Sequence, residues 1–136
     1  MSEHIPVRQY MTTMPETIEE DLELGDAKIR MFEHGIHHLP VVRDGQLIGI
    51  LSARDIAVAE ALTVMDPQHI PVSRIMTQVA FTCGPNAHVE AVAREMAAHH
   101  YGSAVVVDRE HPSHIVGVFT TTDALRALAE ILDSRA

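Results

Sequence analysis

Two short stretches of this chain carry a hydroxyl residue followed three positions later by an aspartate. Ser52 and Asp55 form the first pair, and Thr120 and Asp123 form the second. This spacing is typical of a helix N-terminus, where the hydroxyl accepts a hydrogen bond from a free backbone amide. A helix N-terminus also presents unpaired amides and a partial positive charge, which suit a phosphate or another anion. The residues therefore favour either simple helix capping or the binding of an anionic ligand.

A glycine interrupts the apolar run that precedes each pair. Gly49 lies within residues 47–51, which have the length and apolar density of a buried strand, and Gly117 takes the same place in residues 115–119. A glycine inside a buried strand often marks a place where a ligand or another backbone comes close. The close approach of a ligand and that of another backbone both remain open as explanations of the glycines. The repetition of the whole pattern favours a ligand.

These two stretches each end a longer repeated pattern. The first copy opens with residues 7–13 and the second with residues 72–78, where Met11 matches Met76. Each copy continues with a strand, an amphipathic helix, two apolar strands and a helix rich in alanine and leucine. The pattern predicts a βαββα unit used twice, in an α/β (α+β) fold with domains at residues 1–66 and 67–136. One unit of about 65 residues would be marginally stable, so we expect the two to form one compact module with pseudo-twofold symmetry.

Local signals predict how several of these elements begin and end. Gly35 is well placed to end the helix over residues 24–34. The dipeptide Asp44-Gly45 between two apolar runs predicts a hairpin with a type I′ turn. Asn86 is a good N-cap for the corresponding helix of the second copy.

Composition limits the class of protein. The chain has 136 residues, 46% of them hydrophobic, which is enough for one core, and its longest apolar runs are far too short to span a membrane. A net charge of -9 and scattered basic residues argue against nucleic acid as a partner. The first residues do not have the pattern of a secretory signal, so we expect a cytoplasmic protein.

The order and repetition of these motifs resemble a tandem pair of CBS domains, also called a Bateman module. The resemblance rests on Met-Thr before the first strand, Leu-Pro-Val-Val before the Asp-Gly turn, and the glycine, hydroxyl and aspartate pattern at the end of each copy. It covers about residues 7 to 132. Such modules bind adenosine nucleotides or related adenosyl compounds in clefts between the two CBS units, usually form dimers, and regulate an attached or partner protein. The resemblance implies a non-enzymatic sensor that forms a homodimer and regulates an unidentified protein.

The resemblance also assigns roles to individual residues. Asp55 and Asp123 correspond to the aspartate that binds the ribose, since a carboxylate accepts hydrogen bonds from two neighbouring hydroxyls. Ser52 and Thr120 match the hydroxyl that faces the sugar or phosphate. The remaining implied contacts divide between the two sites. With Asp55 the family pattern groups Thr77, Val79, Tyr101 and Gly102, and with Asp123 it groups Thr12, Met14, His37 and His38.

We expect the two sites to differ in affinity. Arg54 precedes Asp55 and would give a phosphate a permanent cation, whereas Thr122 precedes Asp123 and offers only a hydroxyl. AMP is the first candidate ligand, and ADP, ATP, NAD and S-adenosylmethionine carry the same adenosine.

Two other hypotheses remain beside the nucleotide sensor. One is a structural dimerisation module whose ligand sites are vacant, and the other is a metal or redox sensor built from histidines and Cys83. The ten histidines show no ligand spacing such as H-E-x-x-H, so no metal is predicted. No nucleophile with an oriented base can be named, so no catalytic residue is predicted.

Overall fold

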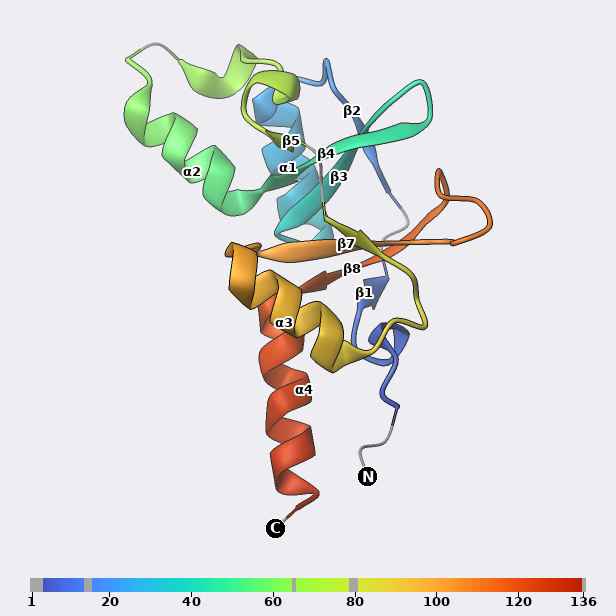
Figure 1. The fold of residues 1–136 in the computed structure, drawn as a ribbon. Coiled ribbons are helices and arrows are strands. Elements are labelled where there is room, and N and C mark those ends of the chain that lie inside the picture. The colour runs from blue at the N-terminus through green and yellow to red at the C-terminus, as the bar shows by residue number, and fades with distance from the viewer. Residues whose placement is uncertain (1–3, 14–15, 65, 79–80, 136) are drawn as a thin grey trace. The chain divides into compact units, whose positions relative to one another are not determined.

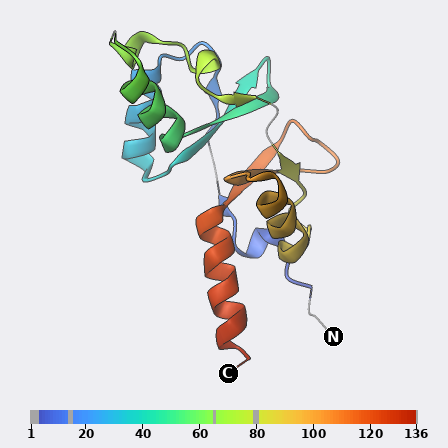
Figure 2. The ribbon, with the colours of Figure 1, turned by 60° about the vertical axis from the view of Figure 1, so that its left-hand side comes forward.

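The computed structural model describes residues 4–13, 16–64, 66–78 and 81–135. The chain divides into two compact units (Figures 1 and 2). We call residues 16–80 the Asp55 unit, and residues 1–15 together with 81–136 the Asp123 unit. Each unit has one four-stranded mixed sheet and contains two of the α-helices described, which confirms the predicted fold class of two βαββα units. The pseudo-twofold packing of the units stays a prediction.

The sheet of the Asp55 unit has the strand order β2-β3-β4-β5. Strands β3 and β4 form an antiparallel hairpin, β2 lies parallel to β3, and β5 lies antiparallel to β4. The elements are β2 (Ile18–Glu19), α1 (Leu24–His34), β3 (His38–Arg43), β4 (Gln46–Ser52), α2 (Ala53–Leu62), two 3-10 turns (Pro67–His69 and Val72–Arg74) and β5 (Thr77–Gln78).

The Asp123 unit repeats this arrangement with the strand order β1-β8-β7-β6. Strands β7 and β8 form the antiparallel hairpin, and β1 lies antiparallel to β8 at the edge of the sheet. The elements are a 3-10 turn (Val7–Gln9), β1 (Thr12–Thr13), β6 (Thr82–Cys83), α3 (Val89–His99), β7 (Ser103–Val107), β8 (Ile115–Thr120) and α4 (Thr121–Asp133).

The opening segment of each sequence repeat belongs to the unit formed by the other repeat. Residues 1–15 open the first repeat but belong to the Asp123 unit, where β1 pairs with β8. Residues 67–80 open the second repeat but belong to the Asp55 unit, where β5 pairs with β4. The expected boundary between residues 66 and 67 refers to the sequence repeats and stays a prediction, because each compact unit combines segments of both repeats.

The structure confirms two of the predictions made from local signals, the turn at Asp44-Gly45 and the helix end at Gly35. Asp44 and Gly45 both have positive φ, 50° and 78°, as a type I′ hairpin turn requires. Gly35, in the left-handed conformation, ends α1, and its amide donates to the carbonyl groups of Met31 and Phe32.

The prediction that Asn86 caps the following helix is wrong. Helix α3 begins at Val89, and its N-cap is His88, whose side chain makes no capping hydrogen bond. The amide oxygen of Asn86 instead accepts a hydrogen bond from Arg8 of the opening segment. The helix thus begins later than predicted, and the Asn86 side chain has a partner that is distant in sequence.

A layer of apolar side chains fills the space between the helices and the sheet in the Asp123 unit. Phe119 and Ala127 are fully buried at its centre. Ala127 lies on the inner side of α4, whereas three leucines of the same helix are 52–60% exposed. These leucines are Leu125, Leu128 and Leu132. Among the described residues, no helix is long and apolar enough to cross a membrane.

Candidate functional site

In each unit a buried strand runs directly into a helix, and the predicted hydroxyl and aspartate lie at that junction. Ser52 is the N-cap of α2; its hydroxyl accepts from the Asp55 amide and its own amide donates to the Asp55 carboxylate, both at 3.0 Å. Thr120 caps α4 in the same way, with the two bonds to Asp123 at 2.9 and 3.2 Å. The capping interpretation is confirmed at both junctions, and it leaves part of each carboxylate available for other partners.

The two strand glycines make room for another backbone. A Cβ atom on Gly117 would lie 2.8 Å from the Thr12 carbonyl oxygen and 2.8 Å from the Met11 sulfur. On Gly49 it would lie 2.6 Å from the Thr77 carbonyl oxygen and 2.9 Å from the sulfur of Met76. Of the two explanations for these glycines, close approach of a backbone is therefore the observed one. The glycines bring the opening segment, with its threonine, alongside the strand that leads to the aspartate.

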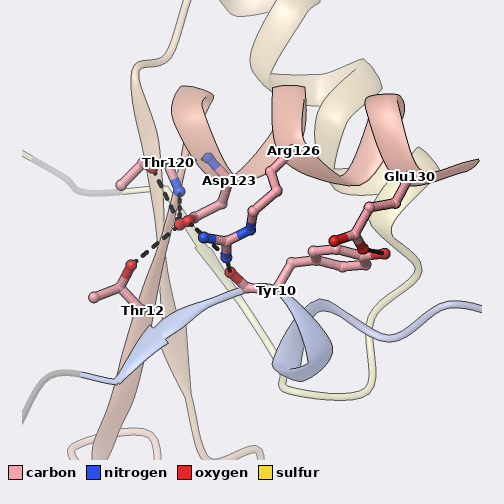
Figure 3. A network of polar contacts seen from close by, with 6 residues as sticks. All are labelled: Tyr10, Thr12, Thr120, Asp123, Arg126 and Glu130. Carbon is pink, nitrogen blue, oxygen red and sulfur yellow. Dashed lines mark hydrogen bonds and ion pairs between the residues drawn. The ribbon is translucent and has the colours of Figure 1, made fainter.

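Asp123 is the centre of a polar network in the Asp123 unit (Figure 3). It is only 3% exposed, and one carboxylate oxygen, Oδ2, accepts from the Thr120 amide at 2.9 Å and from the Thr120 hydroxyl at 3.1 Å. The Thr12 hydroxyl on β1 lies 3.4 Å from the same oxygen. The structure thus brings together Thr12, Thr120 and Asp123, three residues that the family pattern assigns to one site.

Three further residues of this network were not singled out from the sequence. The Arg126 guanidinium lies 3.4 Å from the other Asp123 oxygen, Oδ1, and donates to the Tyr10 carbonyl oxygen at 2.9 Å. The Tyr10 hydroxyl donates to Glu130, and this hydrogen bond, with the burial of the ring, raises the pKa of Tyr10. Asp123, Arg126 and Glu130 are spaced as i, i+3 and i+7 on α4, a signal for one helix face that the sequence does contain.

The Asp55 carboxylate has a simpler environment. Asp55 is partly exposed, and among the described residues the Ser52 amide is the donor recorded for its carboxylate. Thr77 pairs with Ile50 on β4, but within the described residues no hydrogen bond joins its hydroxyl to Asp55. Arg54 is exposed on the first turn of α2. A carboxylate and a cation therefore occupy consecutive positions in the first turn of this helix.

The comparison with known proteins decides the family. A family model of the CBS domain matches residues 7–66 and again residues 72–130. The chain belongs to the CBS domain family. The CBS domain-containing protein YhcV of Bacillus subtilis is 31% identical over 86% of this chain and 81% of its own length. The recognition from sequence is confirmed.

Other relatives extend beyond the CBS pair or were solved with ligands. L-aspartate semialdehyde sulfurtransferase of Methanosarcina acetivorans is 32% identical over 90% of this chain, but the match covers only 24% of that protein. The chain thus spans about a quarter of that relative's length. The CBS domain pair of protein MJ0100, crystallised with 5′-methylthioadenosine and S-adenosyl-L-methionine, is 27% identical, covers 94% of this chain and 98% of its own, and superposes with a TM-score of 0.81.

The other residues that the CBS pattern assigns lie at the helix N-terminus of their own unit. The His37 carbonyl accepts from the Ala53 amide at 2.8 Å, and His38 pairs with Ser52. The Gly102 carbonyl accepts from the amide and the hydroxyl of Thr121, each at 3.1 Å.

Of the other four assigned residues, two are described by the structure and two are not. The Tyr101 ring stacks with the rings of Phe81 and His99, whose centroids are 5.1 and 5.2 Å away. Thr122 is exposed on the first turn of α4. Val79 and Met14 lie outside the described residues. The contacts expected between these segments and the aspartate of the other unit stay predictions.

Two observations concern the hypothesis of a metal or redox centre. Among the described residues, no group of three or more His, Cys, Asp or Glu side chains could hold a metal ion. Cys83 is buried on β6, and its burial raises the pKa of the thiol to about 11. A thiol that stays protonated near neutral pH is a poor nucleophile and reacts slowly with oxidants.

Proposed function

We propose that the chain is a non-enzymatic regulatory module that binds adenosine compounds through Asp55 and Asp123 and regulates a partner protein. The observation that carries the proposal is the repeated carboxylate at a strand-to-helix junction, beside an opening segment that supplies a threonine. A carboxylate accepts two hydrogen bonds from the neighbouring hydroxyls of a ribose, while the adjoining helix N-terminus favours a phosphate. The adenosyl ligands of the MJ0100 pair support this ligand class for a chain that resembles it over 94% of its length.

The contact between Thr12 and Asp123 supports the assignment of these two residues to one site. Both side chains come from residues that the CBS pattern places against the same ribose, and they lie 3.4 Å apart within one unit. By the same pattern, Thr77 and Val79 would serve Asp55 and Met14 would serve Asp123. His37 and His38 would complete the Asp123 site, and Tyr101 with Gly102 the Asp55 site.

AMP is the ligand that we propose first, with ADP, ATP, NAD and S-adenosylmethionine as further candidates. The exposed Arg54 next to Asp55 favours a phosphate at that site, because its guanidinium is charged at every physiological pH. Thr122, in the same place before Asp123, can only donate or accept a neutral hydrogen bond. We therefore expect the Asp55 site to bind the more highly charged ligands.

Homodimer formation through exposed apolar helix faces is part of the proposal. Phe32 on α1 is 88% exposed, and Leu62 on α2 is 78% exposed. The exposed leucines of α4 give the Asp123 unit a similar face. These faces also favour the second candidate function, a dimerisation module with vacant ligand sites, because dimer formation would not depend on a ligand.

A thermal-shift panel with AMP, ADP, ATP, NAD and S-adenosylmethionine tests the ligand. A compound at 100 times its dissociation constant should stabilise the fold by about 2.7 kcal/mol. Asp55→Asn and Asp123→Asn are suitable variants, because asparagine keeps one oxygen for the capping bond but loses the charge and the second acceptor. A shift that shrinks in one or both variants supports the sensor. No shift with any compound would favour the dimerisation module.

A further inference from the structure

The two aspartates that define the proposed sites have different neighbours on their helices. Arg126 follows Asp123 by three positions, whereas Val58 follows Asp55 by three positions. Residues three apart lie on the same helix face, so the side chain at this position can reach the aspartate. Arg126 does so, with its guanidinium 3.4 Å from Asp123 Oδ1. Val58 has no polar atom to offer.

The remaining contacts fix Arg126 in this position. The guanidinium donates to the Tyr10 carbonyl oxygen at 2.9 Å, so it is held from the opening segment as well as from α4 (Figure 3). Thr120 and Thr12 already surround the other Asp123 oxygen. Each of the two Asp123 carboxylate oxygens therefore already has a partner from within the unit.

A ribose must compete with these partners for the carboxylate. Its two neighbouring hydroxyls each need an acceptor, and at Asp123 one acceptor faces a cation and the other faces the two threonines. At Asp55 the recorded donor among the described residues is the Ser52 amide, on Oδ2. The same ligand group thus meets an occupied carboxylate in one site and a more accessible one in the other.

We infer that Arg126 is a positioning residue that weakens ribose binding at Asp123 by holding Oδ1, and so makes the Asp55 site the tighter one. This inference rests on the proposed function. The proposed effect of Arg126 is independent of that of Arg54. Arg126 acts on the binding of the ribose hydroxyls, whereas Arg54 acts on the binding of a phosphate. The ion pair is partly exposed, with 54% of the Arg126 side chain accessible, so its effect is moderate. Removing it should tighten the Asp123 site by a factor of about 1.5 to 5, the range that corresponds to an exposed ion pair.

Calorimetry on single-site proteins tests this inference. In an Asp55→Asn background, Arg126→Val copies the residue that stands at position 58, and Arg126→Gln keeps a donor for the Tyr10 carbonyl without the charge. Adenosine and 2′,3′-dideoxyadenosine are the probes. Both substitutions should tighten adenosine binding and leave the dideoxy compound unchanged, because only the ribose hydroxyls compete with Arg126. A structural change elsewhere in the site would affect both probes.

The reciprocal variant, Val58→Arg, provides the matched control. In an Asp123→Asn background it should weaken adenosine binding at Asp55 by a similar factor. Equal affinities for adenosine with Arg, Val and Gln at position 126 would overturn the inference and leave the proposed function intact. An equal gain for both probes would also overturn it. If neither single-site protein bound adenosine or AMP, the proposed function would fail and the inference with it.

Discussion

Gly117→Ala would place a methyl group where the opening segment packs on β8. The new Cβ would lie 2.8 Å from the Thr12 carbonyl oxygen and 2.8 Å from the Met11 sulfur, whereas ordinary contacts begin at 3.4 Å. The overlap is therefore about 0.6 Å on two sides, and one of the two neighbours is backbone, which cannot rotate away. Strand β1 would have to move from the sheet, and Thr12 would move away from Asp123 with it.

The expected cost is that of an overpacked core position, about 2 kcal/mol in the free energy of unfolding. For a chain of this length, that corresponds to a fall in Tm of roughly 6 °C. Urea unfolding followed by circular dichroism measures the free energy directly. The same variant should also weaken any ligand that depends on Thr12.

Gly102→Ala is the matched control for this substitution. A Cβ there would meet nothing within 4 Å, and Gly102 is not among the glycines with positive φ. We expect its unfolding free energy to stay within about 0.5 kcal/mol of the wild-type value. If Gly117→Ala unfolded like Gly102→Ala, β1 would not pack against β8 as described, and the explanation of both strand glycines would be refuted.

Three further predictions concern individual side chains. His100 ends α3 with a φ of 59°, where α1 has Gly35, so His100→Gly should raise the unfolding free energy by about 0.5 kcal/mol in urea titrations, and a loss would contradict this. The pKa of Tyr10 is raised in the folded state, so the hydrogen bond from Tyr10 to Glu130 stabilises the fold fully at a pH below the usual tyrosine pKa of about 10. This stabilisation is lost as the pH rises through the raised pKa. The difference in unfolding free energy between the wild type and Tyr10→Phe should therefore shrink over this pH range, and a difference that is constant up to pH 12 would refute this prediction. Cys83, with a pKa of about 11, should react with a disulfide reagent at pH 8 roughly a hundredfold more slowly in the folded than in the unfolded protein, and equal rates would contradict its burial.

The sequence was sufficient for the parts of the structure that local rules control. The capping boxes at Ser52 and Thr120, the turn at Asp44 and the helix end at Gly35 follow from the chemistry of a few neighbouring residues. The repeat of these signals was enough to predict both βαββα units.

The features that local rules missed depend on contacts between distant segments. Asn86 is not the cap because α3 begins at Val89 and the cap position falls on His88, while the Asn86 side chain bonds to Arg8 of the opening segment. The two strand glycines could not be explained until the opening segments were seen to pair with the strands of the other repeat. Arg126 shares a helix face with Asp123, but its bond to the Tyr10 carbonyl arises from the topology.

The most direct test of the proposed function is calorimetry with AMP on the wild type, Asp55→Asn, Asp123→Asn and the double variant. We predict that each single substitution removes one binding event and that the double variant binds no AMP, although its circular dichroism spectrum stays that of the folded protein. AMP binding by the folded double variant with wild-type affinity would contradict the claim that these two carboxylates hold the ribose.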